Sequence, residues 1–286
     1  MRRLIALTAT ALVAPALALA ASATAHAAPK PATTSPLDAL RQQLAKRTTV
    51  RIDERTDLRL GRAALRYRET GVVRFGTSGP DASDTKVRVS NGKETQSGRL
   101  IAIGGKVYYK SSPFDEALPA GKTWVRTPGL PRNPLLLDVL QPQTLKALIT
   151  HTKSRTPGGV VGGTRTTLLR GSITLGELAK AAPSGTIPVL LDDKEKDTAL
   201  PWKLWVGGDQ LPRRFASDLA LGQKSSLAGL RVVVDARYTA WGGKVTIQAP
   251  PADQVIDMKD LNDDEDLPEA RPDLITTITG RAARHG

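Results

Sequence analysis

The chain has 286 residues and no cysteine, and its 41 lysines and arginines outnumber 28 aspartates and glutamates to give a formal net charge of +13. The missing cysteine excludes disulfide bonds, thiolate catalysis, cysteine-based metal sites and acylation of an N-terminal cysteine. The basic excess favours an anionic partner, either a membrane surface or an acidic wall polymer, although a well-hydrated surface would carry much of the same charge.

Residues 1–27 are typical of a secretory signal peptide. Two arginines precede an apolar run that ends at Ala25-His26-Ala27, a small-x-small cleavage pattern. The alternative, a membrane anchor, is weakened by Pro15. We therefore expect an exported protein, extracellular or associated with the cell envelope and not anchored through a lipid-bearing cysteine. Export, together with the lack of a base-reading motif, argues against nucleic acid as a partner.

The next segments are a linker and a helix. Residues 28–34, rich in proline and threonine, have no apolar period and predict a linker. In "SPLDALRQQLAKR", Ser35 is suited to the N-cap and Pro36 to the first helical position. Leucines at helical spacing follow, so the sequence predicts a short amphipathic helix.

Residues 49–111 show the patterns of antiparallel strands. In residues 49–60, apolar side chains alternate with charged ones, which is the period of a sheet with one wet face. Turn signals at Asn91-Gly92 and Gly104-Gly105 separate further strand-like stretches. We expect at least five consecutive strands up to "TWVRT", residues 123–127.

The middle of the chain predicts helices. A leucine-rich stretch from Leu135 and a second one that starts at Pro142 fit two short helices. Residues 156–164, "TPGGVVGGT", lack the lysine of a phosphate-binding loop and are interpreted as a flexible loop. A strand at 164–173 and a capped helix from Thr174 follow.

Residues 201–250 predict a closing run of about four strands that includes "KVTIQAP". Trp202 and Trp205 lie three positions apart on one of them, so their side chains must point to opposite faces. We expect Trp202, with Leu204 and Val206, on the concave, helix-covered face, and Trp205 on the convex face. The reverse assignment is also compatible with the sequence.

The order of these elements predicts an α+β fold in which a large, curved antiparallel sheet of about ten strands, a half-barrel, has short helices on its concave side. Residues 35–260 would form one such domain. Residues 261–286 form an acidic and then basic tail. The acidic part could fold back on the basic body or discourage nonspecific adhesion, and the sequence does not decide between these roles.

Four stretches together resemble the LppX/LprAFG group of actinobacterial envelope lipoproteins. They are "IAIGGKVYYKSS" before "TWVRT", the leucine-rich middle, "LWVGGDQLPRRF" and "YTAWGGKVTIQAPPADQV". That group is related to the carriers LolA and LolB and to RseB. The resemblance implies an apolar cavity between sheet and helices that holds acyl chains. The cysteine that receives the lipid in this group is missing here, so the chain looks like a soluble secreted relative.

The resulting hypothesis is an exported, non-catalytic carrier or sensor that binds the acyl chains of a lipid or lipoprotein and uses no cofactor. One alternative is an RseB-like interaction or regulatory module with an envelope protein as partner. Another is a hydrolase that uses His151, but no Gly-x-Ser-x-Gly motif accompanies it, and without cysteine this histidine makes no metal cluster. The residues expected to line the cavity are Leu136, Leu137, Leu140, Leu145, Leu148, Ile149, Trp202, Leu204 and Val206.

Overall fold

The computed structural model describes residues 34–111, 118–128, 138–181, 195–222 and 228–261. The predicted signal peptide, nearly all of the predicted linker and the tail after Leu261 lie outside these ranges. Two of the predicted lining residues, Leu136 and Leu137, lie outside them as well.

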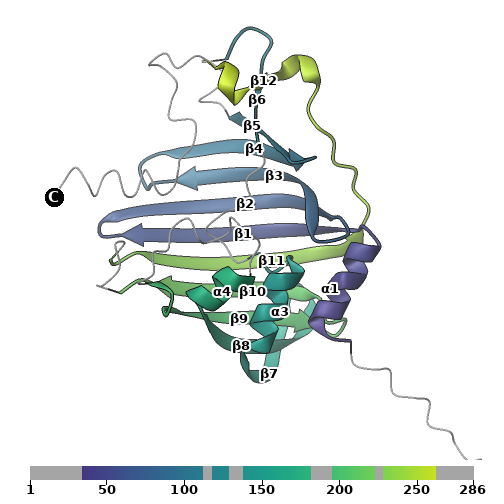
Figure 1. Ribbon diagram of the computed structural model, residues 1–286, viewed down its shortest axis with the longest axis vertical. Coiled ribbons are helices and arrows are strands. Elements are labelled where there is room, and N and C mark those ends of the chain that lie inside the picture. The colour runs from purple at the N-terminus through teal and green to yellow at the C-terminus, as the bar shows by residue number, and fades with distance from the viewer. Residues whose placement is uncertain (1–33, 112–117, 129–137, 182–194, 223–227, 262–286) are drawn as a thin grey trace, which may run out of the picture. The chain divides into compact units, whose positions relative to one another are not determined.

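Twelve strands form one open, curved sheet in the order β12-β6-β5-β4-β3-β2-β1-β11-β10-β9-β8-β7 (Figure 1). All neighbours are antiparallel except β12, which runs parallel to β6. The α+β class and the large antiparallel sheet are therefore confirmed, with twelve strands in place of about ten. The strands are β1 (Thr49–Leu60), β2 (Ala63–Phe75), β3 (Pro80–Ser90), β4 (Thr95–Ile103), β5 (Lys106–Ser111), β6 (Trp124–Pro128), β7 (Thr152–Val161), β8 (Thr164–Thr174), β9 (Ala199–Gly207), β10 (Pro212–Ala220), β11 (Arg231–Gly243) and β12 (Val255–Asp257).

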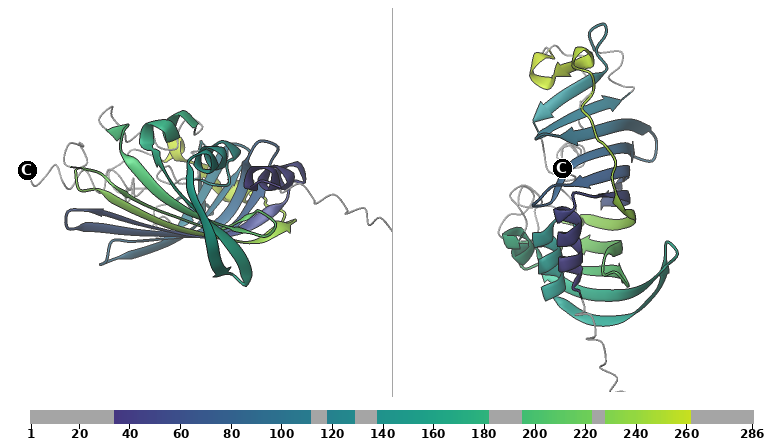
Figure 2. Two further views of the ribbon diagram at one scale, coloured as in Figure 1. Left: turned by 90° about the horizontal axis from the view of Figure 1, so that it is seen from below. Right: turned by 90° about the vertical axis from the view of Figure 1, so that its right-hand side faces the viewer.

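Within the described residues, three α-helices lie on the concave face of the sheet: α1 (Pro36–Ala45), α3 (Pro142–Thr150) and α4 (Leu175–Ala181) (Figure 2). The predicted caps are present. The Ser35 hydroxyl accepts a hydrogen bond from the Asp38 amide at 3.1 Å, and Thr174 and Glu177 cap each other's backbone amides. Most of the helix predicted before Pro142 falls outside the described residues.

Alternation along the strands separates the two faces, as the central strand β1 shows. Val50, Ile52 and Leu58 are buried on the concave face, whereas Arg51 and Arg55, between them, are exposed on the convex face. The register of β1 with β2 and β11 continues this division across the sheet. A large apolar cluster results between the concave face and the helices.

Two predicted segments differ from the structure. Residues 156–161 belong to the edge strand β7 and not to a loop, and the pairing of β7 with β8 is irregular between Pro157 and Gly159. Residues 244–250, expected as a strand, have no strand pairing and lie on the convex face. Together with residues 251–257, which end in β12, we call them the strap. Ile247 is buried there against side chains of the sheet, so the alternating pattern here reflects packing on a sheet and not membership of it.

Candidate functional site

The predicted lining residues that the structure describes lie in one apolar cluster, which we call the helix-side cluster. Leu140, Leu145, Leu148, Trp202, Leu204 and Val206 are each at most 2 % exposed within it, and Ile149 is partly buried against it. Trp202, Leu204 and Val206 share the concave face, as expected. The structure thus brings these residues together, and whether they contact a ligand stays a prediction.

Trp202 owes its position to a glycine on the neighbouring strand. It lies opposite Gly171 of β8, and a Cβ atom on Gly171 would come within 2.3 Å of the indole ring. The indole Nε1–H of Trp202 is buried and has no hydrogen-bond acceptor among the described residues. Trp205 points to the convex face, where the Arg214 guanidinium lies 4.7 Å from the centre of its ring. Trp202 therefore packs in the core on the concave face, whereas Trp205 contacts an arginine on the convex face.

A polar band interrupts the concave face beside this cluster. Glu54 of β1 and Glu69 of β2 lie opposite each other and are 3 % and 2 % exposed. The Tyr67 hydroxyl donates a hydrogen bond to a Glu69 carboxylate oxygen at 2.9 Å. Thr56 and Thr85, both buried, extend the band to β3. The concave face is therefore not apolar throughout, which sequence alternation alone did not indicate.

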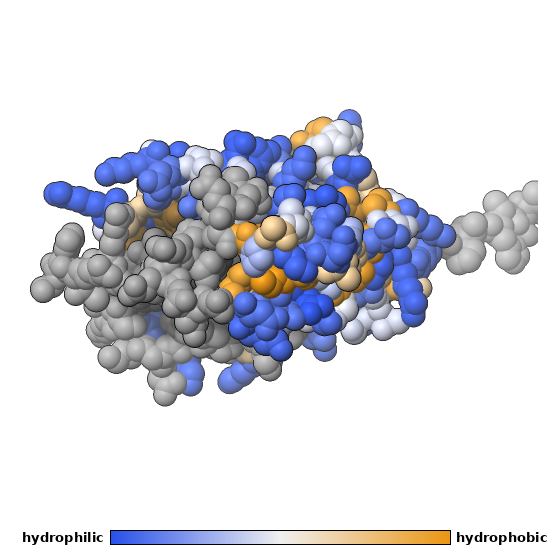
Figure 3. Space-filling model, turned by 90° about the horizontal axis from the view of Figure 1, so that it is seen from above, coloured by the Kyte–Doolittle hydropathy of each residue, from blue (hydrophilic) through white to orange (hydrophobic). Residues whose placement is uncertain are grey.

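Beyond the band, apolar side chains return on the concave face of β3, β4 and β5. The register places Val89, Leu100, Ala102, Val107 and Tyr109 on this face, and we call them the concave floor. Each is partly buried rather than closed off. Helices α3 and α4 pack on β8 and α1 packs on α3, and Figure 1 shows all three away from β4 and β5. Seen from the β6 end, a patch of apolar side chains shows at the surface among hydrophilic ones (Figure 3).

The convex face of the same strands carries a second, smaller core. Ile247 of the strap packs with Ala82, Ile101, Tyr108 and Trp124, and we call this the strap-side cluster. Several contacts fix the end of the strap, including the β12–β6 pairing and a hydrogen bond from the Lys122 ammonium to the Asp253 carbonyl at 2.9 Å. The strap therefore forms a wall that rises from the convex face.

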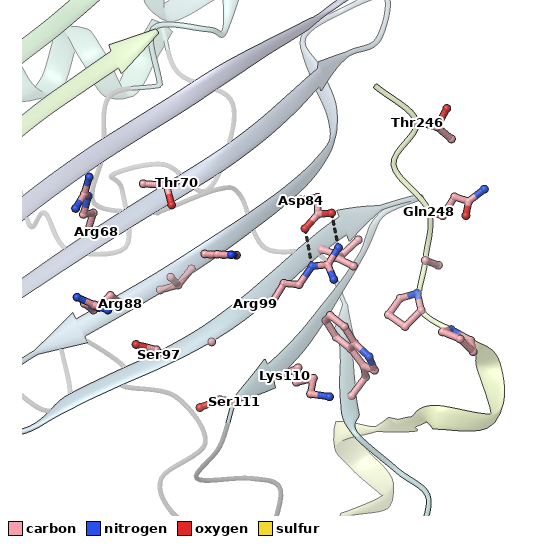
Figure 4. Close-up of a pocket in the computed structure, with 18 residues that line it drawn as sticks. Arg68, Thr70, Asp84, Arg88, Ser97, Arg99, Lys110, Ser111, Thr246 and Gln248 are labelled. Carbon is pink, nitrogen blue, oxygen red and sulfur yellow. Dashed lines mark hydrogen bonds and ion pairs between the residues drawn. The ribbon is translucent and has the colours of Figure 1, made fainter. Parts of the chain in front are cut away.

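Between this wall and strands β2–β5 lies a groove of about 1090 Å³ (Figure 4). Five cationic side chains and one carboxylate line it, together with hydroxyl and amide groups. The charged residues are Arg68, Lys86, Arg88, Arg99, Lys110 and Asp84. The sequence showed the basic excess but not this groove, because its charged residues come from four different strands.

Arginines pair with several carboxylates of the convex face. Arg68 donates two hydrogen bonds to the carboxylate of Asp53, at 3.0 and 2.9 Å, and lowers its pKa. Arg99 donates two to Asp84, at 2.8 and 2.6 Å. Hydrogen bonds from Arg126 lower the pKa of Asp257 in the same way. Part of the basic excess is therefore neutralised within the sheet.

His151, the base of the hydrolase alternative, joins two helices. It is the C-cap of α3, its Nδ1 lies 2.8 Å from the Ala147 carbonyl oxygen, and its Nε2 lies 3.3 Å from a Glu177 carboxylate oxygen. A general base needs a ring nitrogen available to its substrate, and both are engaged here. The described residues contain no group of three or more histidines, cysteines or carboxylates placed to hold a metal ion.

No protein-family model matches the chain, and no curated protein matches it by sequence. Among solved structures, it is similar to LprF from Mycobacterium bovis, with 15% identity, 75% of this chain and 96% of that chain covered, and a TM-score of 0.39. A complex of MucA and MucB from Pseudomonas aeruginosa matches with 13% identity, coverage of 77% and 59%, and a TM-score of 0.28. A LolA superfamily protein from Nitrosomonas europaea matches with 8% identity, coverage of 73% and 94%, and a TM-score of 0.26.

LprF and LolA proteins are among the groups that the sequence resembles, and none of these similarities bears on what the chain binds. No α-helix in the described part of the chain is both long and apolar enough to span a bilayer.

Proposed function

We propose that this protein is an exported, non-catalytic carrier or sensor that holds an acyl chain against the concave floor, next to the helix-side cluster. The observation that carries the proposal is the floor itself. Apolar side chains of β3–β5 are partly open on a face where the described helices do not pack. Partly exposed apolar side chains on neighbouring strands are typical of the lining of a binding site.

The energy of burying an acyl chain can be compared with the energy of attracting the protein to an anionic membrane. Enclosing an acyl chain is worth about 0.8 kcal/mol per CH₂, so a chain of ~16 carbons approaches ~12 kcal/mol when it is fully enclosed. A basic side chain near an anionic membrane adds only about 1 kcal/mol. Apolar contacts would therefore retain the ligand, and the basic excess would hold the carrier near an anionic surface. Because a membrane also offers acyl chains an apolar home, exchange between the two is energetically accessible.

The test uses the full chain, purified from its native host without detergent and analysed by native mass spectrometry. We expect a lipid adduct on the wild-type protein. Leu100→Trp fills the floor and should reduce the adduct several-fold, because Leu100 is only partly buried there. Leu148, fully buried in the helix-side cluster, is a poorer choice because a larger side chain there would disturb the core.

The matched control is Ser97→Trp on the same strand β4. Ser97 lies on the opposite, convex face, so this variant adds a larger side chain without touching the floor. Melting curves check that both variants fold. Absence of lipid from the wild-type protein, or equal loss in both variants, would refute the carrier.

The interaction-module alternative has a separate outcome. If the delipidated protein retains a stoichiometric protein partner in envelope extracts and never carries lipid, the interaction module replaces the carrier. A hydrolytic activity that disappears in His151→Ala would point to the hydrolase.

A further inference from the structure

Like charges face one another across the strands that form the convex groove. The pairing register puts Arg68 of β2 opposite Arg88 of β3. On the next rung, Lys86 of β3 lies opposite Arg99 of β4, and Arg99 lies opposite Lys110 of β5. Like charges directly opposite each other destabilise a sheet, so these cross-strand pairs lower the stability of the fold. A bound anion would relieve this repulsion.

The surrounding carboxylates compensate only part of this charge. Asp53 pairs with Arg68 and Asp84 pairs with Arg99. Within the described ranges, no carboxylate lies within ion-pair distance of Lys86, Arg88 or Lys110. Lys86 and Arg88 are also exposed to solvent. The groove therefore presents three cations that have no carboxylate partner among the described residues.

The shape of the groove favours a chain over a flat surface. The strap closes one side of it through Thr246, Gln248, Pro250 and Pro251 (Figure 4). A planar bilayer cannot follow a wall that rises from the sheet, whereas a single polymer strand can lie beside it.

A second groove of about 740 Å³ continues across the convex face. It shares Lys86 and Arg99 with the first and adds Arg51 of β1 and Arg237 of β11. From β11 to β5 there are five strand spacings, which is about 24 Å in total. The two grooves together therefore offer cations along a path long enough for several anionic groups in a row.

We propose that the convex groove binds a linear polyanion, a chain with repeated phosphate or carboxylate groups that lies across strands β5 to β11. Lys86, Arg88 and Lys110 bind its anionic groups, and Arg99, held in place by Asp84, presents its remaining N–H donors. This deepens the docking part of the proposed function and does not depend on acyl binding.

The experiment measures the affinity of the full chain for long-chain inorganic polyphosphate by titration calorimetry at two salt concentrations. We expect binding that weakens steeply with salt. The double variant Lys86→Gln/Lys110→Gln should weaken it about tenfold, since two contacts with the chain are lost. Ser97→Trp, which fills the groove, should weaken it as well.

The matched control is Lys153→Gln/Lys203→Gln, which removes the same charge from exposed positions outside the groove. It should change the affinity by less than about twofold, through the general field alone. Equal weakening by both double variants would overturn the site.

Competitors distinguish a chain from other anions. Orthophosphate and vesicles of phosphatidylglycerol, at equal phosphate concentration, should displace polyphosphate poorly. If the vesicles bind and polyphosphate does not, the groove proposal fails while docking to an anionic surface stands. If orthophosphate competes equally, the site binds single anions and the proposal of a linear polyanion as its ligand is refuted. Lipid adducts in native mass spectra should be the same in both lysine variants.

Discussion

The two apolar clusters of the molecule lie on opposite faces of the sheet. On the β8–β11 side, the helix-side cluster lies on the concave face, under α1, α3 and α4. On the β3–β6 side, the strap-side cluster lies on the convex face, under the strap. Because strand side chains alternate between faces, either arrangement is open to any strand. The choice depends on what covers the strand.

Both surfaces that we propose for binding lie on strands β3–β5, one on each face. The concave floor of β3–β5 is apolar and adjoins the large core, whereas the convex face of the same strands is a basic groove bounded by the strap. One set of strands can therefore hold an apolar ligand on one face and an anionic one on the other. The helix-side cluster is the larger of the two apolar clusters.

The largest expected effect tests which half holds the fold together. Trp202→Ala should lower the free energy of unfolding by about 3–5 kcal/mol, because it empties a fully buried site in the helix-side cluster. Urea unfolding measures the change. The control, Trp205→Ala, removes the other tryptophan of β9 from the convex face, where it contacts Arg214, and should cost about 1 kcal/mol. Equal losses of unfolding free energy in the two variants would mean that burial in the helix-side cluster contributes no more to stability than the convex-face contact.

A smaller and local effect is expected in the strap. Ile247→Ala removes the strap's buried contact with the strap-side cluster and should cost about 2 kcal/mol or less, since the strap can relax away from the sheet. Hydrogen exchange should speed up at residues 244–257 and stay unchanged in β9–β11. Val245→Ala, at a position that is 43% exposed, is the control and should change neither region. Faster exchange throughout the sheet would contradict the separation of the halves.

Alternation in the sequence was enough to predict much of the helix side. Strands such as β1 and β11 have apolar and charged side chains on separate faces, so the period shows which of their residues share a face. It also shows that Trp202 and Trp205 point to opposite faces, but the concave position of Trp202 comes from the structure. Helix starts were equally readable, because Ser35 and Thr174 carry recognisable caps. These elements are governed by local chemistry.

The structure of the strap side could not be predicted from alternation, for a physical reason. In β4, Leu100 and Ile101 are consecutive and apolar, and Ile101 is buried under the strap on the convex face while Leu100 lies in the partly open concave floor. Period-two patterns do not decide which face is the core in such a strand. The groove was missed because Lys86 and Arg99 become neighbours only through strand register. The edge strand β7 was missed because Pro157 and Gly159 are typical of loops and also of irregular edges.

The smallest effect concerns pH and the end of the strap. Arg126 lowers the pKa of Asp257 below its usual value of 3.8, so the ionised carboxylate is favoured in the folded protein. The stabilisation is therefore complete above pH 3.8 and is lost as the pH falls through the lowered pKa. The amide resonances of Val255 and Ile256, which pair with β6, should shift in that acid range. Asp257→Asn should abolish the transition, and Asp253→Asn in the same strap should keep it. A transition that survives Asp257→Asn would place the acid-sensitive contact elsewhere than in the Arg126–Asp257 pair.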